Sequence, residues 1–203
     1  MRKQVRENLP HQTEGWMAEW TAQWMDGWAP GKNFTWYSRD NRTAREHLLP
    51  HLRLLNQTHC CFCDTYPVED STTEPIEHWR PKGDEEHAGY GYTWTNLYYS
   101  CNRCQACKGA LWELALIQPD TEDYAFETFF EFDFETGVIS PNAVAHDDVK
   151  HRAARTIAIY GLNEASRPYY RRLALRKWVA TAPHEQIIND FAYRNFIEGG
   201  SQN

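Results

Sequence analysis

The sequence has 203 residues, a formal net charge of −7 and 14% aromatic residues, nine of them tryptophan. This aromatic content argues against a disordered chain and favours a packed core. No apolar run approaches the length of a membrane span, and no apolar stretch of the secretory type follows the opening residues 1–4. Composition therefore predicts a cytoplasmic protein without a membrane anchor. The acidic balance also argues against a free-standing nucleic-acid binder, because phosphate contacts dominate such binding.

Charge is unevenly distributed along the chain. Residues 117–135 contain seven acidic side chains and no lysine or arginine, whereas residues 149–178 contain eight basic side chains and only one acidic one, Glu164. Two interpretations stay open: a basic C-terminal surface, or the solvated faces of two helices that pair with the acidic stretch. If it is a surface, Arg171 and Arg176 are candidates for docking a partner.

Two helices are expected in the first 56 residues. Residues 13–28 form the first, because three tryptophans spaced four residues apart fall on one face (Trp16, Trp20 and Trp24). This face is assigned to the core, with partner docking as the alternative. Residues 42–55 form the second helix, and Pro50 within it predicts a kink or break near Leu49.

Short strands and loops are expected between residues 60 and 112, with a helix resuming at Cys104 and continuing toward Trp112. Alternating aromatic and acidic residues over 124–134, followed by a Thr-Gly turn, predict a β-hairpin. Three more helices are expected over residues 145–160, 166–180 and 184–197, with Gly199 and Gly200 releasing the tail. The chain is accordingly divided into an N-terminal helical arm (1–56), a core (57–113) and a C-terminal hairpin with helices (114–203).

Four cysteines form two Cys-x-x-Cys pairs, Cys60/Cys63 and Cys101/Cys104. Two such pairs separated by a few tens of residues can present four thiolates to one tetrahedral zinc ion. Disulfides are the less favoured alternative in a chain without a secretory signal. The second pair could instead use Cys104 and Cys107, and Cys61 is not needed in either case.

The dipeptide Glu77-His78 lies between the two cysteine pairs. At a twisted strand end, the carboxylate can hold a divalent metal while a neutral imidazole takes a proton from water. The metal would stabilise the charge that develops during attack on phosphorus. Arg80 and Lys82 are placed to contact phosphate oxygens, and Lys108 is a further candidate for nucleic-acid binding.

Taken together, these motifs carry a family resemblance. In order they are Cys60-x-x-Cys63, the segment 76–82 (Ile-Glu-His-Trp-Arg-Pro-Lys), Trp94-x-Asn96-Leu97, Cys101-x-x-Cys104, and then Gln105 and Lys108. The pattern resembles HNH endonucleases of the zinc-containing ββα-metal type, and most of all the PtuB-type HNH subunit of Septu antiphage defence, also found beside some retrons. A Thr-Ile-x-x-x-Gly-Leu-Asn segment at 156–163 is similar to the C-terminal part of that family, so the resemblance covers about residues 40–178.

The resemblance implies an α+β fold in which a ββα-metal HNH core, with its four-cysteine zinc knuckle pair, is flanked by N-terminal and C-terminal helices. It implies that His78 is the general base, that Glu77 holds a catalytic Mg²⁺ or Mn²⁺, and that Asn96 fixes the loop and orients the histidine. It implies structural zinc at Cys60, Cys63, Cys101 and Cys104. The expected partners are nucleic acid, DNA more than RNA, and an ATPase of the PtuA type.

One position departs from the family pattern. Family members carry Asn or His directly after the second knuckle to complete the catalytic metal site, whereas this chain has Gln105. Its amide can bind a hard cation but is longer and loses more rotamer entropy, so metal affinity is in doubt. Asp84, Glu86 or His87 could contribute instead. The alternative function is a zinc-stabilised interaction module with a decayed nuclease site, which the retained Glu77, His78 and Asn96 oppose.

Overall fold

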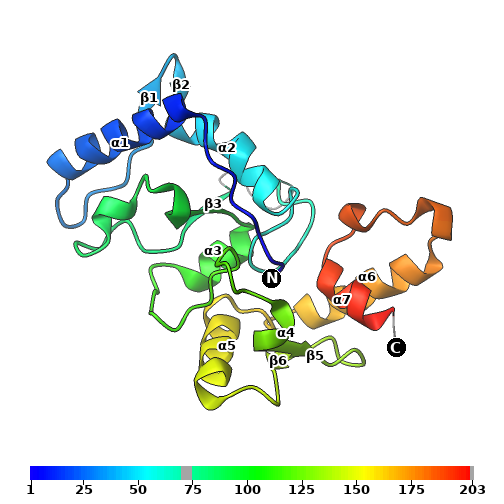
Figure 1. Cartoon of the computed structure of the whole chain (residues 1–203). Helices are drawn as coiled ribbons and strands as arrows, with labels where there is room; N and C mark the ends of the chain where they lie inside the picture. The colour runs from blue at the N-terminus through cyan, green and yellow to red at the C-terminus, as the bar shows by residue number, and fades with distance from the viewer. Residues whose placement is uncertain (70–74, 202–203) are drawn as a thin grey trace.

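The computed structural model describes residues 1–69 and 75–201 (Figure 1). Helices alternate along the chain with three short antiparallel sheets, each of two strands in the described ranges. The predicted α+β class is therefore confirmed at this level. None of the helices described is long and apolar enough to cross a membrane.

The N-terminal part consists of α1 (His11–Asp26), the strand pair β1 (Ser38–Arg39) and β2 (Arg42–Thr43), and α2 (Ala44–Leu55). The tryptophan face of α1 does point into the core, since Trp20 and Trp24 are buried and Trp16 packs partly against the same cluster. Thr43 caps α2 with its side chain in a reciprocal capping box with Glu46, which explains where this helix begins.

Of the kink or break expected near Leu49, a break is absent, because α2 continues as one helix from Ala44 to Leu55. Proline cannot donate the hydrogen bond that the carbonyl of Glu46 would normally accept. The guanidinium of Arg42 donates to that carbonyl instead, with Nη2 2.6 Å from the oxygen. A side chain thus satisfies the group that proline leaves unpaired, and the helix is preserved.

In the middle of the chain, β3 (Ile76–His78) pairs antiparallel with β4 (Leu97–Tyr99), and α3 (Asn102–Lys108) follows directly. Two 3₁₀ turns, η1 (Ala88–Tyr90) and η2 (Trp94–Asn96), lie between the strands. The helix expected to reach Trp112 is shorter than predicted. It ends at Lys108 because Gly109 takes a positive φ of 53°, which turns the backbone out of the helix.

The hairpin predicted over residues 124–139 is correct only in its second part. α4 (Phe126–Phe129) occupies the stretch expected to begin the first strand, and β5 (Phe130–Phe132) then pairs with β6 (Ile139–Pro141). Gly137 closes the turn with a φ of 79°, and a Cβ there would lie 2.1 Å from the carbonyl oxygen of Pro168. Glycine is therefore required at this turn by both conformation and close packing.

Two of the three C-terminal helices agree with the sequence prediction: α5 (Asp147–Ile159) and α6 (Arg167–Ala180). The helix expected over 184–197 is wrong. Two 3₁₀ turns, η3 (Pro183–Glu185) and η4 (Ile188–Asp190), stand there, and α7 (Arg194–Gly200) begins later and includes the two glycines expected to free the tail. A Cβ on Gly199 would lie 2.8 Å from the ring of Phe134, so this glycine packs the helix against its neighbour.

One hydrophobic cluster contains buried residues from all three parts of the chain, 1–56, 57–113 and 114–203. In this cluster the ring of Phe62 stacks on Tyr160 at 4.1 Å between centroids. Trp79, which directly follows β3, stacks on Tyr160 at 6.3 Å between centroids. The N-terminal segment runs past α2 and reaches the C-terminal helices (Figure 1), where the Asn195 amide donates to the Met1 carbonyl. β3, β4 and α3 are thus held from several directions.

Candidate metal centre and catalytic pocket

Four buried cysteines converge at the start of α3. The Sγ atoms of Cys60, Cys63, Cys101 and Cys104 all lie within 4.8 Å of one another. Cys63 Sγ and Cys101 Sγ are 3.7 Å apart, close to the sulfur separation of about 3.8 Å that a tetrahedron with bonds of about 2.3 Å requires. The donor set and its spacing fit a structural metal such as zinc.

The remaining two cysteines lie outside this cluster. Cys107 is half-buried, and its thiol donates to Glu164 Oε2 at 3.6 Å. Cys61 is fully buried, and burial raises the pKa of its thiol well above the ordinary value. The cluster therefore pairs Cys104 with Cys101, as the favoured register predicts, and not with Cys107.

A buried arginine lies against the cysteine cluster. Arg167, from the first turn of α6, donates from Nη2 to Cys104 Sγ at 3.1 Å and from Nη1 to the carbonyls of Tyr160 and Gly161. Burial opposes its charge, but negative charge on the four surrounding cysteine sulfurs raises the pKa of Arg167. A zinc ion with four thiolates carries a net charge of about −2, so a permanent cation here offsets part of that charge. Sequence reasoning counted this arginine only as part of a basic stretch.

We expect Arg167→Met to weaken zinc binding by about 10–100-fold, the usual effect of losing a hydrogen bond to a metal ligand. Competition with a chromophoric zinc chelator measures this affinity. Arg176→Met is the matched control, because Arg176 is an exposed arginine of the same helix. Equal zinc affinity in the two variants would contradict a role for Arg167 in holding the cluster.

Glu77 and His78 close strand β3 and line one pocket, together with residues of the segments 32–34, 81–83 and 108–110. Both side chains are nearly buried, at 7% and 4% exposure. Adjacent strand residues normally point to opposite faces, and a strand end relaxes that rule. The structure therefore brings the predicted acid and the predicted base to the same pocket.

The hydrogen bonds of His78 define which nitrogen carries the proton. Nε2 lies 3.0 Å from the carbonyl oxygen of Gly91, which can only accept, so Nε2 donates. Nδ1 is then the acceptor and faces the ammonium of Lys82 at 3.3 Å. Burial, with the positive charge of Lys82, lowers the pKa of His78 well below its ordinary value. The imidazole is accordingly neutral near pH 7, with its lone pair on the Lys82 side.

Lys108 differs from expectation. It was predicted to contact nucleic acid, but it is only 1% exposed. Its ammonium donates to Glu77 Oε1 and to the His78 carbonyl, both at 2.8 Å. Burial raises the pKa of the Glu77 carboxyl, and the Lys108 charge acts in the opposite direction. The short helix α3 ends with this lysine beside the carboxylate, so Lys108 is a structural partner of the acid.

We expect Lys108→Met to destabilise the fold by about 3–5 kcal/mol, because it leaves a buried carboxylate without its cation. Urea unfolding measures the change. The double variant Lys108→Met with Glu77→Gln should recover part of the loss, since it removes both charges. A single variant as stable as the parent protein would show that the pair is not coupled.

Asn96 holds the chain that follows His78. Its Oδ1 accepts from the backbone N–H of Arg80 at 2.6 Å, and its Nδ2 donates to the carbonyls of Arg80 and Tyr90 at 3.2 and 3.0 Å. These bonds go to the backbone around the imidazole, so Asn96 positions the loop next to the histidine. The Arg80 guanidinium lies 4.3 Å from the centre of the Tyr90 ring. Phosphate contacts by Arg80 and Lys82 stay predictions.

Gln105 is not among the residues that line the Glu77 pocket. Its amide Nε2 donates to the carbonyl of Ser100 at 3.0 Å. The alternative ligands do not line the pocket either: His87 pairs with Asp84 at 3.2 Å and packs on Trp112. Within residues 1–69 and 75–201, Glu77 is the only carboxylate that lines this pocket. One oxygen of this carboxylate already accepts from Lys108, so the pocket offers at most one free carboxylate oxygen to a divalent ion.

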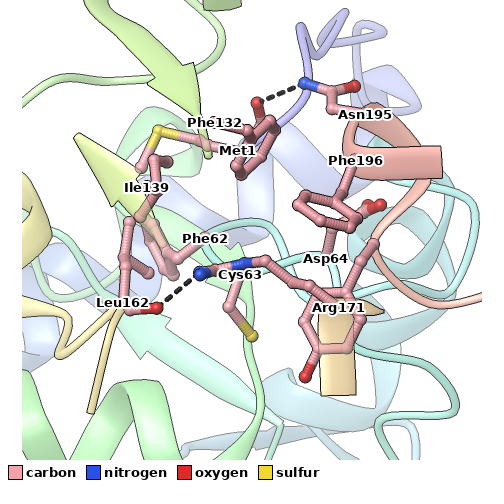
Figure 2. A pocket seen from close by; sticks show the side chains of 11 residues that line it. Met1, Phe62, Cys63, Asp64, Phe132, Ile139, Leu162, Arg171, Asn195 and Phe196 are labelled. Atoms are coloured by element: carbon pink, nitrogen blue, oxygen red, sulfur yellow. Dashed lines mark hydrogen bonds between the residues drawn. The ribbon is translucent and has the colours of Figure 1, made fainter. Parts of the chain in front are cut away.

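A separate small hollow lies beside Cys63, between the N-terminal residue and α7 (Figure 2). Its wall includes Arg171, which was a candidate for docking a partner. That assignment is wrong, because the Arg171 guanidinium is 3% exposed and donates to the carbonyls of Gly137 and Leu162. Burial lowers its pKa to about 10. Arg171 joins α6 to the hairpin, whereas Arg176 is exposed and stays a candidate.

No family model matches this chain, and no curated protein matches it.

Proposed function

We propose that this protein is a metal-dependent endonuclease of the HNH type, which hydrolyses phosphodiester bonds at the Glu77–His78 pocket. The observation that carries the proposal is the state of His78, a neutral buried imidazole whose Nε2 is fixed by Gly91 and whose Nδ1 accepts at the pocket beside a carboxylate. A general base requires an unprotonated nitrogen in a fixed position, and the lowered pKa of His78 keeps its Nδ1 unprotonated near pH 7.

The order of elements supports the same proposal. An antiparallel strand pair, β3 and β4, is followed at once by α3, and the cysteine cluster fixes the beginning of that helix. His78 ends one strand opposite Leu97 of the other, and Asn96 immediately precedes that partner. The arrangement agrees with the ββα-metal core that the sequence motifs imply.

In this mechanism, Nδ1 of His78 takes a proton from a water molecule as its oxygen attacks phosphorus. The Gly91 carbonyl keeps the ring in the required tautomer and stabilises the imidazolium that forms. Lys82 lines the same pocket, and a phosphate that accepts from its ammonium would release Nδ1 of His78 to take the proton. A divalent ion held by Glu77 would stabilise the developing charge on the leaving oxygen.

By its resemblance to the PtuB-type subunit of Septu systems, the protein would act in the cytoplasm as the nuclease of an antiphage defence system, together with a PtuA-type ATPase. The net charge of −7 agrees with weak binding to nucleic acid when the chain acts alone. A partner that supplies basic surface would compensate for it.

A second candidate is the zinc-stabilised interaction module with a decayed nuclease site. Two observations favour it: Lys108 occupies one oxygen of Glu77, and the Gln105 amide is bound to the Ser100 carbonyl. The hydrogen-bonded state of His78 weighs against it, because a scaffold does not require that tautomer.

Plasmid DNA and RNA, each incubated with the protein in Mg²⁺ or Mn²⁺, test the two candidates. The assays are run with and without the ATPase partner, and the protein is compared with Glu77→Gln. Cleavage that Glu77→Gln abolishes supports the nuclease. Absence of cleavage in every condition supports the interaction module.

A further inference from the structure

One wall of the Glu77–His78 pocket comes from the N-terminal part of the chain. Lys32, Asn33 and Phe34, in the segment between α1 and β1, line the pocket together with Glu77 and His78. These residues precede the part of the sequence that carries the HNH motifs. The pocket is therefore built from more than the strand pair and helix that the motifs describe.

Phe34 fixes this segment against the general base. Its ring lies 5.0 Å from the His78 ring and 4.9 Å from the Tyr92 ring, measured between centroids. The approach depends on Gly91, where a Cβ would lie 2.6 Å from Phe34 Cε2. The same glycine supplies the carbonyl that holds His78 Nε2. The segment is thus packed on the atoms that orient the base.

Two further contacts hold the N-terminal arm in place. The indole N–H of Trp24 donates to the Ala88 carbonyl at 3.0 Å, and the Tyr37 N–H donates to the Tyr92 hydroxyl at 2.8 Å. One contact lies before the segment 32–34 in the chain and one after it. Lys32 is consequently presented at the pocket by an anchored loop.

The charges of the pocket favour an anion. Three lysines line it, Lys32, Lys82 and Lys108, and the Lys108 charge is balanced by Glu77. Lys32 is exposed, and its ammonium donates to the Gly27 carbonyl. No carboxylate in residues 1–69 and 75–201 forms an ion pair with it. An ammonium has three donors, so one bond to a carbonyl leaves capacity for a phosphate.

We propose that Lys32 binds a backbone phosphate of the nucleic-acid substrate next to the phosphodiester at His78, an inference that rests on the proposed nuclease function. The N-terminal arm is then part of the substrate-binding surface. A phosphate contact of this kind contributes to affinity for any base sequence.

The test uses the full chain with His78→Ala, so that substrate binds without being cut. The probe is a fluorescein-labelled oligonucleotide of the kind, DNA or RNA, that the active protein cleaves, and anisotropy gives its dissociation constant at several salt concentrations. Adding Lys32→Ala should weaken binding and reduce the slope of log K against log salt by about one. Lys32→Arg should restore both values, because it keeps the charge.

Lys3→Ala is the matched control. Lys3 is also a lysine whose ammonium donates to backbone carbonyls, those of Thr121 and Glu122, and it does not line the pocket. A salt slope equal to the parent value in Lys32→Ala, or an equal loss in Lys3→Ala, would overturn the inference while leaving the nuclease intact. Failure of the parent protein to cleave or bind either oligonucleotide even with the ATPase partner present would instead remove the proposed function, and the inference with it.

Discussion

Replacement of His78 by alanine is expected to lower the rate of phosphodiester cleavage by about 10²–10⁴-fold, the usual contribution of a positioned general base. The physical reason is specific to this site. Gly91 holds Nε2 in the donor state, so Nδ1 is the atom that can take the proton, and alanine supplies no substitute. The single-turnover rate on saturating substrate measures the chemical step.

His47→Ala is the matched control for this variant. His47 also places Nε2 3.0 Å from a backbone carbonyl, that of Arg39, and its ring packs on Trp16 at 4.9 Å between centroids, as that of His78 packs on Trp36 at 5.6 Å. It lies on α2 and does not line the pocket. His47→Ala should keep the full rate once both variants are shown to be folded. An equal loss in the two variants, or full activity in His78→Ala, would contradict the proposed mechanism.

Spacing in the sequence was sufficient to predict a four-cysteine site and the buried side of α1, whereas the choice of Cys101 over Cys107 came from the family resemblance. Two Cys-x-x-Cys pairs have few ways to meet at one point, and tryptophans four residues apart must share a helix face. The adjacency of Glu77 and His78 likewise identified the pocket, because a strand end can bring neighbours together. These features depend on local geometry, which the sequence encodes directly.

The buried cations could not be identified in this way. Lys108, Arg167 and Arg171 read as surface charges in the sequence, since lysine and arginine are mostly exposed. Their burial depends on partners distant in sequence: a carboxylate on β3, a thiol on α3 and carbonyls near the hairpin. Only the assembled fold creates those partners.

The prediction of a helix over residues 184–197 was wrong for a related reason. Residues 184–197 have a helical pattern, but tertiary bonds decide the outcome. The Arg194 guanidinium is fully buried and donates to Asp64 Oδ1 at 2.7 Å, and the Tyr193 backbone takes a positive φ of 61° directly before it. This ion pair fixes the start of α7 next to the first cysteine pair. The intrinsic helix propensity of residues 184–197 is weak, and a tertiary contact of this kind overrides it.

The second large effect concerns the cysteine cluster. We expect Cys104→Ser to lose zinc and to unfold the region around α3, because structural zinc in small sites supplies about 10–16 kcal/mol of folding free energy. Cys104 is fully buried and accepts a bond from Arg167, so its loss also removes the sulfur acceptor of that guanidinium. Metal content by mass spectrometry under native conditions and circular dichroism measure the two losses together.

Cys107→Ser and Cys61→Ser provide matched controls for this variant. Cys107 lies on the same short helix but outside the cluster, and Cys61 is as buried as the ligands yet is not one of them. Both controls should keep one zinc ion per chain, although Cys61→Ser is expected to lose some stability from burying a hydroxyl. Zinc retained in Cys101→Ser but lost in Cys107→Ser would overturn the register, since Cys104 belongs to both possible pairs. Loss of fold in Cys104→Ser, together with an absence of zinc in the parent protein, would show that the four thiols contribute only packing. The position of Lys108 beside Glu77 would then depend on the packing of α3 and not on a metal ion.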